Sequence, residues 1–221
     1  NALYAYQGRM AGAERLAAEA CHIELDRCRK PIGKQDQFIA AYGGLQYIRF
    51  NPDGSVYTDP ILSSSATRKQ LVNRLLLLYT GLTRRADDIL TEQSRETHTD
   101  QEKRASLRTM VGLADQLAEA LERNDLDAFG EILHAGWLEK RKLATGISNG
   151  RIDDWYERAR SAGAIGGKIL GAGGGGFLLL YADQAHHTDI CRALPELRPI
   201  PFHFAPQGSK VIFVEENGYK S

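Results

Sequence analysis

The sequence predicts an α+β fold in which helices and strands are segregated along the chain. Three observations predict it: two β-prone runs flank a turn near residue 52, amphipathic helical patterns fill the middle of the chain, and apolar runs before and after those patterns look like buried strands. The 221 residues are 43% hydrophobic, which suffices for a real core.

The N-terminal part predicts helices and then a hairpin. Residues up to about 28 are rich in Ala and Glu and predict one or two helices, and residues 36–42 predict a short helix that ends at two glycines. Residues 45–50 and 55–58 are β-prone runs around an Asn-Pro-Asp-Gly turn, which predicts a β-hairpin.

The rest of the chain predicts a second domain, and we place the boundary between residues 1–62 and 63–221, where a serine-rich run begins. Residues 71–79 predict a buried strand because they are almost continuously apolar, and three helical patterns follow. Towards the C-terminal end, the sequence predicts a strand at 177–181, a helix near 184–194, and strands near 200–204 and 210–214.

Composition and charge argue against several classes of partner. Lysine plus arginine (28) balances aspartate plus glutamate (28), so nothing favours a nucleic acid or an anionic membrane. No apolar run approaches the ~20 residues of a membrane span. The three cysteines, Cys21, Cys28 and Cys191, are an odd number at irregular spacing, which favours reduced thiols in a cytoplasmic protein.

A glycine-rich stretch is the most informative feature of the chain. Eight of the fourteen residues from Gly163 to Gly176 are glycine. Glycine costs backbone entropy on folding, so an ordered protein keeps it where no Cβ is tolerated. The usual reason is a backbone that points several N–H groups at a ligand, most often phosphate. A structural turn and a flexible linker are the alternatives, although a linker would be richer in serine and polar residues.

A second chemical cluster lies where the helix at residues 36–42 begins. Asp36 follows Lys34 closely, and a carboxylate at a helix N-terminus near a lysine should stay ionised at neutral pH. Such an aspartate can accept the proton of a substrate hydroxyl, or hold that hydroxyl in line, during phosphoryl transfer. Alternatively, Asp36 does nothing more than cap the helix.

Both clusters resemble motifs of one kinase family. Residues 168–177, Lys-Ile-Leu-Gly-Ala-Gly-Gly-Gly-Gly-Phe, look like the third conserved motif of the GHMP kinases. Residues 33–44, which contain Gly-Lys-Gln-Asp-Gln, resemble the catalytic segment of the heptose-phosphate kinase branch, with the L-fucose kinase domain nearby. Residues 78–84 also fit that branch, and the resemblance extends over essentially the whole chain.

The resemblance implies a fold and a reaction. Residues 1–62 would be the C-terminal part of an N-terminal domain of the ribosomal protein S5 domain 2 type. Residues 63–221 would be a ferredoxin-like GHMP kinase C-terminal domain with extra helices. The implied reaction transfers the γ-phosphoryl group of ATP, with Mg²⁺ as cofactor, to the anomeric hydroxyl of D-glycero-D-manno-heptose 7-phosphate.

Position by position, the resemblance also implies a set of site residues. Asp36 takes the place of the catalytic aspartate, with Lys34 near the developing charge on the transferred phosphoryl group. Glu24 lies at the spacing at which related sugar kinases place a Mg²⁺-binding glutamate, and a solvated helix charge is the alternative. The residues implied around the donor phosphate and the acceptor are Gly171, Ala172, Gly173, Gly174 and Gly175.

The run Thr83-Arg84-Arg85 suggests a site for a phosphate that the substrate already carries. Thr83 can cap the helix that follows, and Arg84 would project near the N-terminus of that helix, where a guanidinium and free N–H groups bind phosphate. Such a site suits a heptose 7-phosphate better than a free sugar. An exposed basic turn is the alternative.

The resemblance has one gap. GHMP kinases hold the ATP phosphates with an upstream glycine- and serine-rich loop, and these 221 residues contain no such loop. We therefore expect this truncated chain to be nearly inactive alone. Two alternative functions stay open: a kinase of an unphosphorylated hexose such as fucose or mannose, and a non-catalytic remnant that binds a sugar or a nucleotide.

Overall fold

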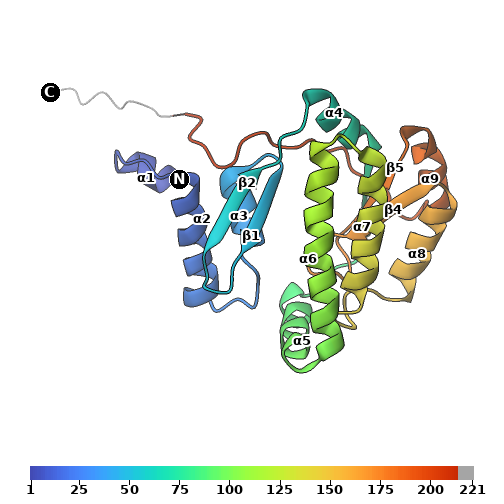
Figure 1. Cartoon of the computed structure of the whole chain (residues 1–221), viewed down its shortest axis with the longest axis horizontal. Coiled ribbons are helices and arrows are strands. Elements are labelled where there is room, and N and C mark those ends of the chain that lie inside the picture. Colours follow the sequence, from blue (N-terminus) through green and yellow to red (C-terminus); the bar gives the residue numbers. More distant parts are fainter. Residues whose placement is uncertain (214–221) are drawn as a thin grey trace. The chain divides into compact units, whose positions relative to one another are not determined.

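The computed structural model describes residues 1–213, and its mixture of helices and antiparallel sheet confirms the predicted α+β class (Figure 1). The chain divides into two compact units: Asn1–Pro60 together with the segment that starts at Phe204, and Ile61–His203. The first division therefore falls two residues before the boundary placed after Leu62, and the chain returns to the first unit near its end. The assignment of residues 1–62 and 63–221 to two kinase domains stays a prediction.

The first unit consists of short helices and one hairpin, as its sequence predicts. Its elements are α1 (Ala2–Tyr6), α2 (Ala13–Cys21), the π-helix η1 (His22–Arg27), α3 (Gln35–Tyr42), β1 (Gln46–Phe50) and β2 (Val56–Pro60). The two strands pair antiparallel. A small apolar core joins α2 to α3 through Ala17, Cys21, Phe38 and Ala41.

The segment from Phe204 is tied to the end of α3 by backbone hydrogen bonds. Gly44 N donates to Ala205 O at 2.8 Å, and Ser209 N donates to Ala40 O at 3.0 Å. Gly43 adopts φ of +69°, and a Cβ there would lie 2.2 Å from the carbonyl carbon of Gln207. Glycine at the end of α3 therefore serves two purposes, because it ends the helix and admits the returning chain.

The second unit is a four-stranded antiparallel sheet with helices packed on it, in the strand order β4-β5-β3-β6. Its strands are β3 (Leu75–Tyr79), β4 (Ala164–Ile169), β5 (Phe177–Ala182) and β6 (Arg198–Pro199). Its helices are α4 (Ser65–Arg74), α5 (Ala86–Thr99), α6 (Gln101–Glu122), α7 (Leu126–Arg141), α8 (Gly150–Ser161), the 3₁₀-helix η2 (Gln184–His186) and α9 (His187–Ala193).

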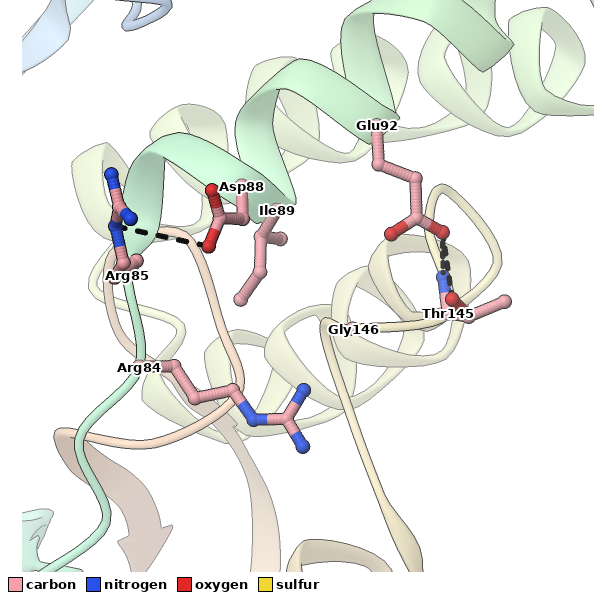
Figure 2. A pocket seen from close by; sticks show the side chains of 7 residues that line it. All are labelled: Arg84, Arg85, Asp88, Ile89, Glu92, Thr145 and Gly146. Atoms are coloured by element: carbon pink, nitrogen blue, oxygen red, sulfur yellow. Dashed lines mark hydrogen bonds and ion pairs between the residues drawn. The ribbon is translucent and has the colours of Figure 1, made fainter.

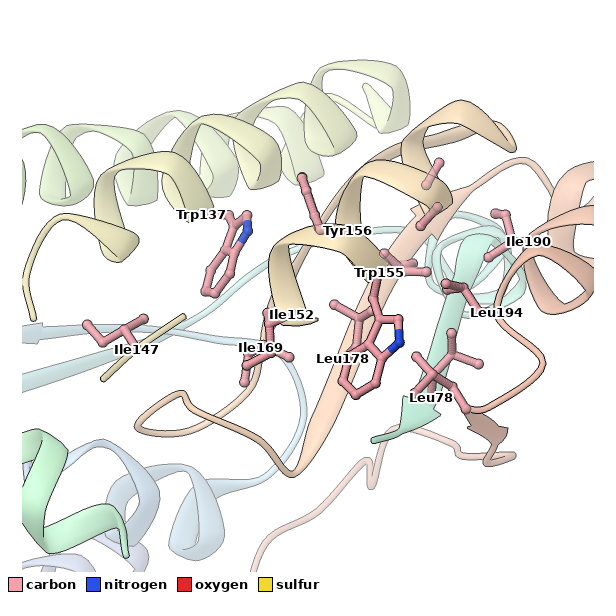
Figure 3. Packing of buried hydrophobic residues seen from close by; sticks show 14 of the residues in the cluster. Leu78, Trp137, Ile147, Ile152, Trp155, Tyr156, Ile169, Leu178, Ile190 and Leu194 are labelled. Carbon is pink, nitrogen blue, oxygen red and sulfur yellow. The ribbon is translucent and has the colours of Figure 1, made fainter. Parts of the chain in front are cut away.

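The core of the second unit lies between the sheet and the helices α7, α8 and α9 (Figure 3). Its fully buried side chains come from both layers and include Leu78, Trp137, Ile152, Ile169 and Leu178. Burial of such a side chain stabilises the fold by about 1.5–3 kcal/mol relative to exposure. The glycine-rich connection between β4 and β5 starts directly from this core, because Ile169 and Leu178 pair across it.

In this unit one predicted strand boundary is wrong and one strand was missed. Residues 71–74 form the end of α4, so the strand predicted over 71–79 begins only at Leu75. The apolar pattern is continuous across this change, whereas the decisive signal is Ser64, whose Oγ accepts from Thr67 N at 3.0 Å and starts the helix. Within the glycine-rich stretch, Ala164–Ile169 is a strand, which the sequence did not predict.

The strands predicted near residues 200–204 and 210–214 are absent from the described residues, where β6 contains only Arg198 and Pro199. Ile200 N still donates to Leu77 O at 2.9 Å, and the ladder then ends. Pro201 follows directly and has no N–H group to continue the pairing. Residue 214 lies outside the described part of the chain.

We expect Gly166→Ala to destabilise the second unit by about 2–3 kcal/mol, because a Cβ at Gly166 would lie 2.1 Å from the carbonyl oxygen of Gly130 on α7. The matched control is Gly136→Ala on α7, where nothing lies within 4 Å of the new Cβ and helix propensity should raise stability slightly. Urea unfolding followed by tryptophan fluorescence measures both. Equal stability of the two variants would contradict the close α7–β4 packing.

Candidate functional site

The first unit contains a cavity that brings two of the predicted site residues together. The cavity has a volume of about 430 Å³, and Glu24 from η1 and Asp36 from α3 both line it. Gln37, the residue after Asp36, lines it as well. The spacing of the two acids in the sequence thus corresponds to two neighbouring helices that present carboxylates to one space.

Asp36 lies in the first turn of α3. The helix begins after Lys34 and has no side-chain cap, so Asp36 does not act as one. Asp36 is exposed and forms no hydrogen bond or ion pair within residues 1–213. Its carboxylate is therefore available to a ligand.

Glu24 is half-buried and is held by a neighbour from α3. Its Oε2 accepts a hydrogen bond from Gln37 Nε2. The surrounding turn is a π-helix, a rare, widened form that is frequently found at functional sites. Glu24 is thus fixed at the cavity wall, in contrast to a freely solvated helix charge.

Lys34 is not brought to this cavity. Its ammonium group donates to Gly54 O, in the turn of the hairpin, at 3.4 Å, and Lys34 does not line the space that Glu24 and Asp36 share. The geometry of the first unit thus gives Lys34 a contact with the β1–β2 turn.

The glycine-rich connection of the second unit, residues 170–176, is an ordered loop fixed by close backbone contacts. Gly174 N donates to Ile147 O and Gly176 N donates to Leu82 O, both at 2.9 Å. A Cβ at Gly173 would lie 2.8 Å from Ile147 Cα, and one at Gly175 would lie 2.5 Å from Leu82 O. Packing against neighbouring backbone therefore requires glycine at these positions, and the linker interpretation is wrong.

The loop also keeps N–H groups free. Among the described residues, no backbone carbonyl accepts from the N–H groups of Gly171, Ala172 or Gly175. Gly171 adopts φ of +64°, and a Cβ at this position would have no neighbour within 4 Å, so its conformation and not its packing favours glycine. Free N–H groups on successive turn residues are the arrangement that binds anions.

Two lysines lie beside the loop. Lys140, near the end of α7, donates to Gly171 O at 2.5 Å. Burial, together with the neighbouring charge of Lys168, lowers the pKa of Lys140 to about 8. Burial also lowers the pKa of Lys168, on β4. Neither lysine forms an ion pair among the described residues, so this end of the loop carries uncompensated positive charge.

Arg84 contributes to a second cavity, of about 320 Å³, within the second unit (Figure 2). Its side chain extends into the space between α5 and the chain at Gly146, and its Cδ would be 3.1 Å from a Cβ at Gly174. Arg84 has no hydrogen bond or ion pair within residues 1–213, whereas the neighbouring Arg85 faces Asp88 at 3.9 Å. The structure thus brings Arg84 to the glycine loop.

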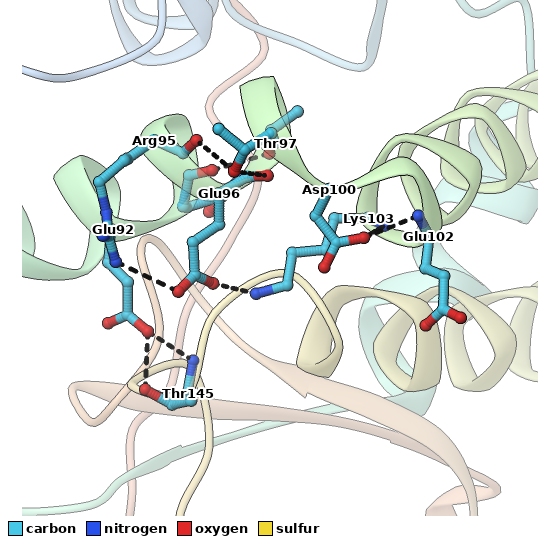
Figure 4. A network of polar contacts seen from close by, with 10 residues as sticks. Glu92, Arg95, Glu96, Thr97, Asp100, Glu102, Lys103 and Thr145 are labelled. Atoms are coloured by element: carbon cyan, nitrogen blue, oxygen red, sulfur yellow. Dashed lines mark hydrogen bonds and ion pairs between the residues drawn. The ribbon is translucent and has the colours of Figure 1, made fainter.

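The far wall of this cavity is held by Glu92. Its Oε1 accepts from Thr145 N at 3.0 Å and from Thr145 Oγ1 at 2.7 Å, and these hydrogen bonds lower the pKa of Glu92. A chain of polar contacts continues along the helices, because Glu96 pairs with Lys103 of α6 (Figure 4). These contacts fix α5 against α6 and against the chain at residue 145.

The prediction that Thr83 caps the following helix is wrong. Helix α5 begins at Ala86, its N-cap position is Arg85, and no side chain caps it. Arg85 still has extended backbone angles, with φ of −73° and ψ of 111°, so the helix starts too late for Thr83 to reach its N–H groups. Thr83 is exposed and does not line the cavity that contains Arg84.

Four residues at these sites were missed from the sequence: Gln37, Glu92, Lys140 and Thr145. Gln37 stands inside the Lys-Gln-Asp-Gln segment, so its position was a usable signal. Lys140 donates to Gly171 and Thr145 donates to Glu92, partners that lie 31 and 53 positions away in the chain. No local sequence pattern indicates such contacts.

Residues 117–199, which include the sheet strands β4 and β5 and the glycine-rich connection between them, match the family described as GHMP kinases C terminal. The match confirms the resemblance noted in the sequence.

The sequence is also similar to two named sugar kinases. The chain is 28% identical over 201 residues to D-glycero-alpha-D-manno-heptose 7-phosphate kinase of Campylobacter jejuni, covering 90% of this chain and 59% of that protein. It is 31% identical over 163 residues to a bifunctional fucokinase/GDP-fucose pyrophosphorylase of Arabidopsis thaliana, covering 72% and 15%. The chain thus spans less than two thirds of the length of these relatives.

Solved structures show the same fold. Streptococcus pneumoniae phosphomevalonate kinase, determined in complex with phosphomevalonate and AMPPNP, superposes with a TM-score of 0.72 at 15% identity and covers 90% of this chain and 63% of that chain. In the described part of the present structure, no helix combines the length and the apolar character needed to cross a membrane.

The lowered pKa of Lys140 makes stability depend on pH. Because the folded chain releases this proton near pH 8 and the unfolded chain near 10.5, the free energy of unfolding should gain up to about 3 kcal/mol from this group as pH rises between these values. Lys140→Met should lose that gain, measured by urea unfolding at pH 7 to 10. Lys142→Met, at the same helix end, is the control. The prediction would be contradicted if the free energy of unfolding changed with pH in the same way in the wild type and in Lys140→Met.

Proposed function

We propose that this chain is part of an ATP-dependent sugar kinase that phosphorylates the anomeric hydroxyl of a heptose 7-phosphate. The single observation that carries the proposal is the cavity in which Glu24 and Asp36 meet. Support comes from the family match of residues 117–199 and from the similarity to the Campylobacter jejuni heptose phosphate kinase.

Asp36 has the chemistry of the residue that handles the acceptor hydroxyl. Its carboxylate is unpaired within residues 1–213 and lies at the N-terminal turn of α3. An ionised carboxylate within hydrogen-bonding reach of a sugar hydroxyl takes its proton or fixes its lone pair towards the phosphorus atom. Such positioning accounts for much of the catalysis of phosphoryl transfer, since the reaction needs little covalent participation by the protein.

Glu24 and Gln37 fit a magnesium ion chemically. Both residues line the cavity, and carboxylate and amide oxygens are ligands that hard cations prefer. When bound, Mg²⁺ supplies positive charge to the phosphate oxygens of ATP. Gln37 Nε2 keeps Glu24 in position for this role by donating a hydrogen bond to its Oε2.

The glycine loop and its neighbouring cations suit the phosphate groups. The free N–H groups of Gly171, Ala172 and Gly175 can donate to phosphate oxygens, and Lys140 holds the start of the loop through Gly171 O. Arg84 packs on Gly174 and keeps an unpaired guanidinium among the described residues, which can bind a phosphate on the substrate with two parallel hydrogen bonds.

A second candidate is a kinase of an unphosphorylated hexose such as fucose. The similarity to the Arabidopsis thaliana bifunctional fucokinase supports it. Arg84 can separate the two candidates by experiment, because a guanidinium binds a phosphate group through stronger, charge-assisted hydrogen bonds than it forms with a neutral hydroxyl.

Asp36→Asn should lower the rate of phosphoryl transfer by about 10²–10⁴-fold, because it removes the proton acceptor while leaving the shape of the side chain. The measurement is ³¹P NMR of Mg²⁺-ATP with D-glycero-D-manno-heptose 7-phosphate, run on this chain and on the complete product of its gene. Asp26→Asn, an exposed carboxylate of η1 that does not line the cavity, is the control. An unchanged rate in Asp36→Asn would contradict the role of Asp36.

Arg84→Ala should raise KM for heptose 7-phosphate by about tenfold or more and leave KM for a neutral hexose unchanged, because it removes a charge-assisted contact to phosphate. Arg85→Ala is the matched control, since Arg85 is adjacent but faces Asp88. Steady-state kinetics with both sugars measure the effect. Equal KM changes for the two sugars would favour the hexose kinase.

A further inference from the structure

Gln37 has a half-satisfied amide group in the cavity of the first unit. The residue is only 8% exposed, and its Nε2 donates to Glu24 Oε2. Its Oε1 is buried and receives no hydrogen bond from any described residue. A buried acceptor without a donor costs free energy, and buried polar atoms in folded proteins are rarely left in this state.

The orientation of this amide is fixed by chemistry. A carboxylate accepts hydrogen bonds and does not donate them, so the NH₂ group must face Glu24 and the carbonyl oxygen must face away from it. A reversed amide would place two acceptors against each other. The unsatisfied atom at this site is therefore an oxygen, and its partner must be a hydrogen-bond donor or a cation.

The charges of the side chains around the cavity favour a cation. The lining residues are Asn1, Leu16, Ala20, Glu24, Asp36, Gln37, Ala40, Ala41 and Ser209. No lysine or arginine is among them, and neither carboxylate forms an ion pair within residues 1–213. Two uncompensated carboxylates beside an amide oxygen make a wall that attracts a divalent cation.

Carboxylates alone do not complete such a site. In the described part of the chain, no three His, Cys, Asp or Glu side chains converge on a position that holds a metal ion. The oxygen that Gln37 contributes is of the kind that Mg²⁺ and Mn²⁺ accept as ligand or as partner of a bound water. It is also the buried side-chain atom of this cavity that lacks a partner among the described residues.

We propose that Gln37 is a positioning residue of a divalent-cation site: its Nε2 holds Glu24 in place, and its Oε1 faces the cation together with Glu24. The inference rests on the proposed function in one respect, the assignment of Glu24 to the metal. It adds a role for a residue next to the proton acceptor Asp36, and it explains why an amide is buried beside two acids.

Mn²⁺ alone is the probe, and the electron paramagnetic resonance signal of free Mn²⁺ measures its binding to the chain. Gln37→Met, which keeps the length of the side chain and removes both polar atoms, should weaken binding about tenfold or more. Gln37→Glu keeps an oxygen at the Oε1 position but replaces the Nε2 donor to Glu24 with an acceptor, so it should bind Mn²⁺ more weakly than the wild type and more tightly than Gln37→Met. The matched control is Gln35→Met, an exposed position on the same helix, which should bind like the wild type.

Three results would overturn the proposal. The first is Gln37→Met binding Mn²⁺ as tightly as the wild type, the second is Gln37→Glu falling as far as Gln37→Met, and the third is Glu24→Gln binding unchanged. Circular dichroism melting checks that each variant folds, and if Gln37→Met does not, Gln37→Glu and Glu24→Gln decide. The assay contains no nucleotide or sugar, so a failed kinase assay with normal Mn²⁺ binding rejects the sugar kinase and leaves the cation site intact.

Discussion

The close approach of two backbone segments to the glycine loop is the constraint on which the second unit's site depends. Gly173 lies against Ile147 and Gly175 against Leu82, at distances that no Cβ allows. Two hydrogen bonds from the loop, to Ile147 O and Leu82 O, fix the same contacts. Because Arg84 follows Leu82 within two residues, the loop sets where its guanidinium lies. Glycines that look suited to a ligand are thus also required by packing.

Each unit supplies one sign of charge for the proposed chemistry. The first unit gathers two carboxylates and an amide oxygen at a cavity that no lysine or arginine lines. The second keeps Lys140 and Lys168 beside the glycine loop without acidic partners in the described residues. Burial of a charge without a partner is costly, whereas an exposed charge such as that of Asp36 is solvated by water. Each unit by itself thus keeps charged groups that the protein does not pair among its described residues.

The fold was predicted from the sequence where its signals are local. The hairpin turn, the helical periodicities and the short helix before Gly43 are read from neighbouring residues, and the structure confirms them. Strand β4 was missed because Gly166 and Gly167 hide its strand character, and Gly166 is there to admit the backbone of α7. The site residues stay a prediction: the resemblance to the kinase family implied Glu24 and Asp36, which line one cavity, whereas the contacts of Gln37 and Lys140 depend on packing that no local pattern indicates.

The charged side chains of the Arg84 cavity differ in how far the protein itself pairs them. Arg85 faces Asp88, and Glu92 is occupied by two hydrogen bonds from Thr145, so these three charges are largely committed within the protein. Arg84 is the cation of this cavity that has no partner in residues 1–213. A phosphate would bind that guanidinium through charge-assisted hydrogen bonds, which are stronger than the neutral hydrogen bonds that a sugar hydroxyl accepts. Within the proposed function, Arg84 is therefore the residue of this cavity through which an acceptor with a phosphate group would differ from a neutral sugar.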